Sequence, residues 1–336
     1  MDYVERFRPN VHIQSDLIRC ALSEFFSTAL LMFGGCCVSA QFVLSRGTVN
    51  TWFGVNIGWG LVLTFAVYAG FYISGSHLNP AVSFFLFTMG RLSGPRCVVY
   101  SIAQTVGAFV GAAFTFLTYY DAFMNFDGGE RQVSGPLATA GVFATYPKPY
   151  LTVIGGLVDQ IIGTAFLCIC VSLITDKKNK IPGHLQPLLI GLLVALIGMT
   201  VGMNSGYAIN PARDLGPRLF TLCAGWGIET FSYRNYTWFW IPLLGPMIGA
   251  VVGAWIYQLC IGMQLDIESV LNNKKSDETT KQTTDKNNAS KTTDENADEE
   301  LDLLVKRRQI ITGSIIWKTC AEYPRGVTAL GVNCFS

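Results

Sequence analysis

Two copies of the tripeptide Asn-Pro-Ala are the residues most able to do chemistry: Asn79-Pro80-Ala81 and Asn210-Pro211-Ala212. Asparagine is among the best helix N-caps and proline suits the first helical position, so each copy predicts the start of a short helix. An asparagine amide also carries two hydrogen-bond donors. Two such helix starts facing each other inside a membrane would direct two positive dipole ends and two amides at one place.

The composition indicates the elements that must position these tripeptides. Half of the residues are hydrophobic and only 14% are charged, which is typical of an integral membrane protein. Six apolar stretches each supply most of the ~20 residues that a spanning helix needs. They cover residues 17–44, 51–73, 96–119, 152–174, 188–203 and 238–261. We therefore expect an all-α membrane protein with six spanning helices.

The chain is an internal repeat. When the two tripeptides are aligned, Glu24 matches Gln160, and the pair Gly107 and Gly111 matches Gly249 and Gly253. Each half contains three spans, so the second half enters the membrane with the opposite orientation. The two tripeptides then open re-entrant half-helices of about ten residues, long enough at ~1.5 Å per residue to reach the midplane.

Charge and composition divide the chain further. Basic residues gather in alternate loops, so by the positive-inside rule we expect both termini in the cytoplasm. The expected parts are an N-terminal segment (1–16), the first pore repeat (17–119), a long extracellular loop (120–150), the inverted second repeat (151–262) and a mostly disordered cytoplasmic tail (263–336).

Several other classes of site are not indicated. The net charge is +1 and there is no basic stripe with interleaved aromatic residues, which argues against nucleic-acid binding. Most of the ten cysteines lie within or beside apolar spans, and the three histidines are scattered. We therefore expect no metal, no cofactor and no catalysis.

Residues 15–262 resemble the major intrinsic protein family, the aquaporins. The resemblance is carried by Ser-Gly-Ser-His-Leu-Asn-Pro-Ala-Val at 74–82 and Gly-Tyr-Ala-Ile-Asn-Pro-Ala-Arg-Asp-Leu-Gly-Pro-Arg at 206–218. Asp214, Pro242-Leu243 and the long third loop are similar to the aquaglyceroporin subgroup. The resemblance implies an aquaporin-like right-handed bundle, a homotetramer with one pore per protomer, and a plasma-membrane channel for glycerol, water and other small neutral solutes such as urea.

By motif position, the resemblance places the narrowest point of the pore at Trp59, Gly198, Tyr207 and Arg213. Gly198 leaves space where a water-selective member would place histidine. The two aromatic rings would face a polyol's carbon backbone, and Arg213 would donate hydrogen bonds to its hydroxyls. An arginine at membrane depth costs about 3 kcal/mol on insertion scales unless it faces water or a partner, which supports a pore-lining Arg213.

Other polar residues are expected to support the pore. Glu24 should accept amide donors of the re-entrant backbone, with a proton relay as the alternative; Gln160 at the matching position favours the supporting role. His77 should shape its loop, with pH gating as the alternative. Asp214 should pair with a cation such as Arg218. Asp159 has no role that the sequence explains, and Asn235 begins a sequon suited to glycosylation in an outer loop.

Three competing functions remain open from the sequence. A water-selective channel is disfavoured by Gly198 and Asp214. A coupled transporter with inverted repeats would need ion-binding carboxylates near the midplane, for which only Glu24 and Asp159 are candidates. A scaffolding or adhesive role would not require the two intact tripeptides.

Overall fold

The computed structural model describes residues 2–264, and six helices in this range are long and apolar enough to cross a membrane. This confirms the predicted all-α membrane architecture. They are α2 (Asp16–Leu44), α3 (Trp52–Gly70), α5 (Gly94–Thr118), α7 (Val153–Thr175), α8 (Gln186–Val201) and α11 (Ile241–Tyr257). No strand occurs among these residues. Helix α3 ends at Gly70, before the expected residue 73, and the chain continues through a turn into Gly75 and Ser76, whose φ angles are positive.

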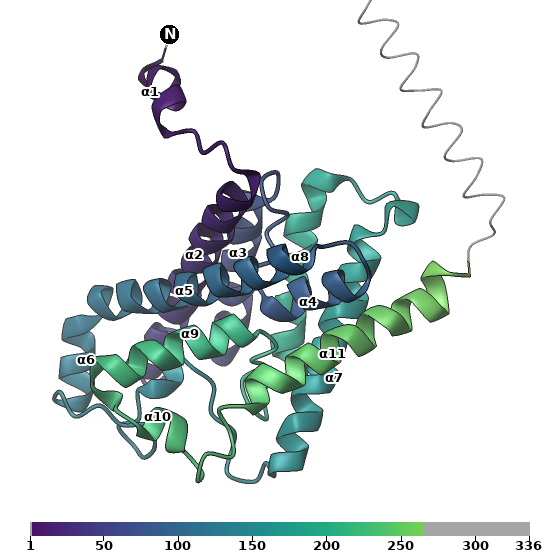
Figure 1. The fold of residues 1–336 in the computed structure, drawn as a ribbon. Helices are drawn as coiled ribbons and strands as arrows, with labels where there is room; N and C mark the ends of the chain where they lie inside the picture. Colours follow the sequence, from purple (N-terminus) through teal and green to yellow (C-terminus); the bar gives the residue numbers. More distant parts are fainter. Residues whose placement is uncertain (1, 265–336) are drawn as a thin grey trace, which may run out of the picture. The chain divides into compact units, whose positions relative to one another are not determined.

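Two short helices follow the Asn-Pro-Ala tripeptides, as the sequence predicts: α4 (Pro80–Thr88) and α9 (Pro211–Thr221). Asn79 Oδ1 accepts the Ala81 N–H at 2.9 Å, and Asn210 Oδ1 accepts the Ala212 N–H at 3.0 Å. With nine and eleven residues, each helix extends about 15 Å, half of the hydrocarbon core. Both lie among the longer helices (Figure 1).

The packing repeats in the two halves. Helix α2 packs on α5, and α7 packs on α11 in the equivalent arrangement. Each half-helix also contacts the third span of the other half, α4 against α11 and α9 against α5. A Cβ on Gly107 would collide with the Phe25 carbonyl and one on Gly249 with the Ile161 carbonyl, so these matched glycines let the backbones approach closely.

The loop at 120–150 is folded rather than irregular. It contains α6 (Tyr120–Asp127) and a 3₁₀ turn, η1 (Ala140–Val142). The rings of Phe123 and Phe143 stack with centroids 5.6 Å apart, and Trp226 packs edge-on against Phe143 at 5.4 Å. Arg131 pairs with the buried Asp127 carboxylate and lies over the rings of Phe123 and Trp226. This cluster holds the loop against Trp226, which follows α9, while α6 and η1 also contact α2 of the first half.

The remaining elements are short. They are α1 (Tyr3–Val11), η2 (Lys177–Asn179), η3 (Gly183–Leu185), η4 (Leu222–Trp226), α10 (Glu229–Ser232) and η5 (Gln258–Gly262). Helix α1 lies in the N-terminal segment 1–16, for which the sequence predicts no helix. None of its residues is buried. The expected disordered tail lies, after Gln264, outside the described residues.

Candidate pore and its constriction

The two loops that lead into α4 and α9 share one unusual backbone pattern. Gly75, Ser76 and Leu78 have positive φ angles, and Gly206, Tyr207 and Ile209 have them at the matching positions. A β-branched residue such as Ile209, at φ +41°, is a genuine outlier that persists only when its surroundings hold it. The strain therefore needs a support in each half.

Glu24 supplies that support in the first half. Its carboxylate is fully buried and accepts the backbone N–H groups of His77 at 2.9 Å and Leu78 at 2.8 Å. It also accepts the Ser74 hydroxyl at 2.6 Å and the Gln104 amide at 2.8 Å. Four donors are satisfied by one side chain, and two of them belong to the strained loop.

Gln160 takes the equivalent place in the second half. Its Oε1 accepts the Ile209 N–H at 2.9 Å, and its Nε2 donates to Ser205 Oγ at 2.8 Å. Asp159, which the sequence left unexplained, accepts Asn204 Nδ2 at 2.9 Å and the Ser205 hydroxyl at 2.6 Å. Asp159 and Gln160 together hold this strained loop by hydrogen bonds, as Glu24 holds the loop of the first half.

We expect Glu24→Gln to lower stability while glycerol and water permeation are retained. A glutamine presents one acceptor oxygen instead of two, so one buried backbone N–H loses its partner at a cost of about 1–3 kcal/mol. The change is measured as the midpoint of thermal unfolding in detergent, with exposed Glu5→Gln as the control. Loss of permeation in correctly inserted Glu24→Gln, without loss of stability, would instead support a proton relay.

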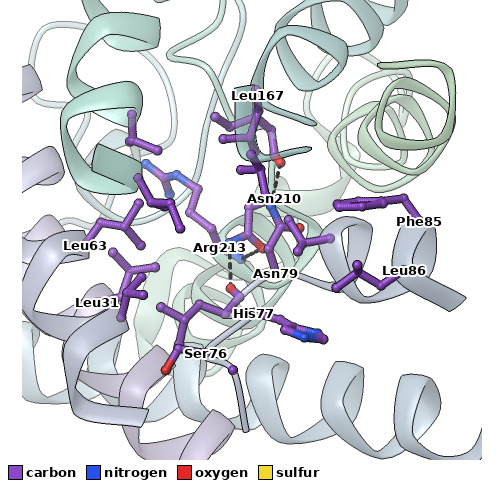
Figure 2. A pocket seen from close by; sticks show the side chains of 18 of the residues that line it. Leu31, Leu63, Ser76, His77, Asn79, Phe85, Leu86, Leu167, Asn210 and Arg213 are labelled. Carbon is purple, nitrogen blue, oxygen red and sulfur yellow. Dashed lines mark hydrogen bonds between the residues drawn. The ribbon is translucent and has the colours of Figure 1, made fainter. Parts of the chain in front are cut away.

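The two asparagines hold each other's loops. Asn79 Nδ2 donates to the Ile209 carbonyl at 3.0 Å, and Asn210 Nδ2 donates to the Leu78 carbonyl at 2.8 Å. Both side chains line one pocket, between apolar residues such as Leu31 and Leu167 (Figure 2). Each amide has a second N–H, which these bonds leave available to a molecule in the pocket.

Two cavities lie end to end along this region. The Arg91 vestibule, of about 380 Å³, extends from Arg91 and Phe71 past both asparagines. The Lys148 vestibule, of about 460 Å³, is bordered by Lys148, Tyr146 and Phe42. The residues that line both are Trp59, Tyr207 and Arg213. These three side chains therefore mark the boundary between the vestibules.

The guanidinium of Arg213 is fixed from two sides. Its carbon lies 4.5 Å from the centroid of the Trp59 ring, which is a cation–π distance. Its Nη1 donates to the Phe143 carbonyl at 2.7 Å. The folded loop at 120–150 thus holds Arg213 through a backbone group, a contact that no feature of the sequence indicates.

Gly198 does not take the place expected from the sequence. It is not among the residues that line either vestibule, and an added Cβ would lie 2.5 Å from Asn56 Oδ1 and 2.7 Å from Tyr207 Cζ. The glycine makes room for the Tyr207 ring instead of bordering an open space. Sequence reasoning also missed Asn56, although an asparagine inside an apolar span is a signal that could have found it.

Asp214 and Arg218 form a buried ion pair at 2.7 Å, the partnership that the sequence favoured. Asp214 also accepts the Thr145 N–H at 2.8 Å, and Arg218 donates to the carbonyls of Thr145 at 2.7 Å and Thr230 at 2.6 Å. Burial raises the pKa of the neighbouring Tyr146 above its ordinary value. The pair connects Thr145 of the loop at 120–150 and Thr230 of α10 to α9.

His77 lies in the wall of the Arg91 vestibule. Its Nδ1 lies 3.0 Å from Ser83 Oγ, and its ring packs edge-on against Tyr100 with centroids 5.2 Å apart. These contacts join the first loop to α4 and α5. Among residues 2–264, no group of three His, Cys, Asp or Glu side chains is arranged to hold a metal ion.

Comparison with known proteins decides the family. The model of the family described as major intrinsic protein matches residues 12–257, most of the chain. The chain belongs to the major intrinsic protein family. As a member of this family it is 48% identical to aquaporin-9 of Mus musculus over 252 residues, 75% of this chain and 85% of that protein. It is 41% identical to aquaporin-10 of Homo sapiens over 255 residues, 76% of this chain and 84% of that protein.

A solved structure in the same family has the same fold. The X-ray structure of the aquaglyceroporin from Plasmodium falciparum superposes with a TM-score of 0.65 at 32% sequence identity. The superposition covers 72% of this chain and 95% of that one. The family expected from the two tripeptide motifs is therefore confirmed, and so is the subgroup expected from Asp214, Pro242-Leu243 and the long third loop.

Proposed function

We propose that this protein is a passive channel for glycerol and water whose constriction is formed by Trp59, Tyr207 and Arg213. The observation that carries the proposal is that the two vestibules share these three residues. Its family and its aquaglyceroporin relatives support the same function. Other small neutral solutes such as urea belong to the same chemical class.

A solute in the constriction contacts two kinds of surface, one apolar and one that donates hydrogen bonds. The rings of Trp59 and Tyr207 are apolar faces suited to the carbon backbone of a polyol, and Arg213 has donors for its hydroxyl groups. Beyond it, the free N–H groups of Asn79 and Asn210 replace part of the solute's hydration. The N-termini of α4 and α9 converge there and oppose the passage of protons and cations.

The functional test is permeation in purified, reconstituted vesicles. Stopped-flow light scattering in parallel water and glycerol gradients should show fast protein-dependent flux of both, unaffected by Na⁺ or pH gradients. Fast water flux without glycerol flux would indicate a water-selective channel. Dependence of glycerol flux on an ion gradient would indicate a coupled transporter.

We further propose a plasma-membrane protein with the Arg91 vestibule and both termini on the cytoplasmic side. The Lys148 vestibule then opens outward, and Asn235, which is exposed in the loop between α10 and α11, lies on the outer side and can accept a glycan. We expect a homotetramer in the lipid bilayer with one pore per protomer. Native mass spectrometry and glycosidase treatment of Asn235→Gln test the assembly and the glycan.

Arg213→Val is expected to raise proton leak about tenfold, which corresponds to ~1.4 kcal/mol in the barrier. The substitution removes a full cation beside the two helix dipoles and releases the Phe143 carbonyl. Leak is measured with a pH-sensitive dye inside vesicles, with Arg213→Lys as the charge-preserving control. Equal leak in correctly inserted Arg213→Val and the parent would remove Arg213 from the constriction.

A further inference from the structure

The polar atoms of both aromatic rings of the constriction are hydrogen-bonded to side chains of the protein. Trp59 Nε1 donates to Ser39 Oγ at 3.1 Å, and the Tyr207 hydroxyl donates to Asn56 Oδ1 at 2.8 Å. Each ring also fills a notch left by a glycine, Trp59 against Gly35 and Tyr207 against Gly198. The orientation of these rings therefore depends on residues other than the three of the constriction: Ser39, which lines the Lys148 vestibule, and Asn56, which lines neither vestibule.

Among the described residues, Asn56 makes one side-chain hydrogen bond, with the Tyr207 hydroxyl. It lies on α3, three residues before Trp59, its side chain is fully buried, and it is not among the residues that line either vestibule. Its Nδ2 has no hydrogen-bond partner in the described structure. A buried amide with an unmade hydrogen bond costs about 1–3 kcal/mol. An apolar residue would avoid that cost, but it would leave the Tyr207 hydroxyl without an acceptor.

We propose that Asn56 is a positioning residue that sets the glycerol selectivity of the channel by holding the Tyr207 hydroxyl out of the lumen. The proposal rests on the constriction proposed above. It assigns part of the selectivity to a side chain that no solute touches.

The physical reason is the cost of an unsatisfied hydroxyl. Without Asn56 the Tyr207 hydroxyl is buried with no acceptor, and the nearest water lies in the vestibules that the same ring borders. The ring therefore turns toward the lumen, where its hydroxyl narrows the aperture. Glycerol is wider than water, so its permeation falls more.

The test compares five variants in vesicles with equal amounts of inserted protein. Asn56→Val should lower the ratio of glycerol to water permeability by about threefold or more. Tyr207→Phe supplies the reference ratio for the double variant, because a phenylalanine ring has no hydroxyl to satisfy. The double variant Asn56→Val/Tyr207→Phe should then have the same ratio as Tyr207→Phe, since no hydroxyl is left for Asn56 to hold.

Thr64→Val is the matched control. Thr64 is a buried polar residue on the same helix, donates to its own helix at Gly60 and packs beside Gly191 of α8, away from the constriction. The ratio of glycerol to water permeability in Thr64→Val should equal that of the parent. If Asn56→Val does not reach the membrane, Asn56→Ser, whose side chain is too short to reach the hydroxyl, takes its place with the same expected ratio.

Two results would overturn the role of Asn56: a parent ratio in Asn56→Val, or a ratio in the double variant that is lowered relative to Tyr207→Phe as much as Asn56→Val is lowered relative to the parent. Tyr207→Ala separates this failure from failure of the constriction itself. If Tyr207 lines the constriction, Tyr207→Ala should admit a longer polyol such as sorbitol. Admission of sorbitol with a normal Asn56→Val ratio would reject Asn56 alone, whereas exclusion of sorbitol would reject Tyr207 as a constriction residue.

Discussion

Gly198→His is expected to abolish most glycerol permeation, by about tenfold or more, and to retain much of the water permeation. A Cβ at this position would lie 2.5 Å from Asn56 Oδ1 and 2.7 Å from Tyr207 Cζ, so the tyrosine ring must leave its notch and move toward the lumen. The imidazole adds bulk while still offering water a hydrogen-bond partner. Stopped-flow swelling in glycerol and water gradients measures both fluxes.

The same substitution at Gly183 is the control, since Gly183 precedes α8, is exposed, and an added Cβ there would make only an ordinary contact, with Phe71 Cε1 at 3.9 Å. Gly183→His should conduct both solutes as the parent does. Adding Trp59→Phe to Gly198→His relieves crowding but does not restore the space that the Tyr207 ring fills. Glycerol permeation through this double variant should therefore remain impaired. If Gly198→His is inserted normally and carries glycerol at the parent rate, the constriction proposed here is wrong.

Asp214→Ala is expected to cost about 3–5 kcal/mol of stability, because it leaves the buried Arg218 guanidinium without its counter-charge. The exposed fraction of the Arg218 side chain is 1% and that of Asp214 is 0%. The variant also removes the acceptor of the Thr145 N–H. Thermal unfolding in detergent should show a large drop in the midpoint, and less protein should reach the membrane.

Glu5→Ala provides the comparison, because Glu5 forms an exposed ion pair with Arg8 that water already screens. Its unfolding midpoint should match that of the parent. The double variant Asp214→Leu/Arg218→Met should recover part of the lost stability, since replacing both partners leaves no buried charge. A midpoint for Asp214→Ala as high as that of Glu5→Ala would contradict the structural importance of the pair.

Local features of the sequence were enough to predict the architecture. Six apolar runs of sufficient length predict six spans, because a membrane requires each span to satisfy its own backbone. Asn79-Pro80 and Asn210-Pro211 predict two helix starts, because capping is decided within three residues. The odd number of spans per repeat then requires the inversion.

The pairing of polar atoms around the constriction was decided by the tertiary structure. Tyr207 and Asn56 are 151 positions apart, and Arg213 and Phe143 are 70 positions apart. Whether such groups meet depends on how closely α3, α8 and the folded loop pack, and a shift of one ångström makes or breaks a hydrogen bond. For the same reason Gly198 was expected beside the lumen but lies behind Tyr207. Composition and spacing thus determined the family and the frame of the pore, whereas helix packing determined which side chains face its interior.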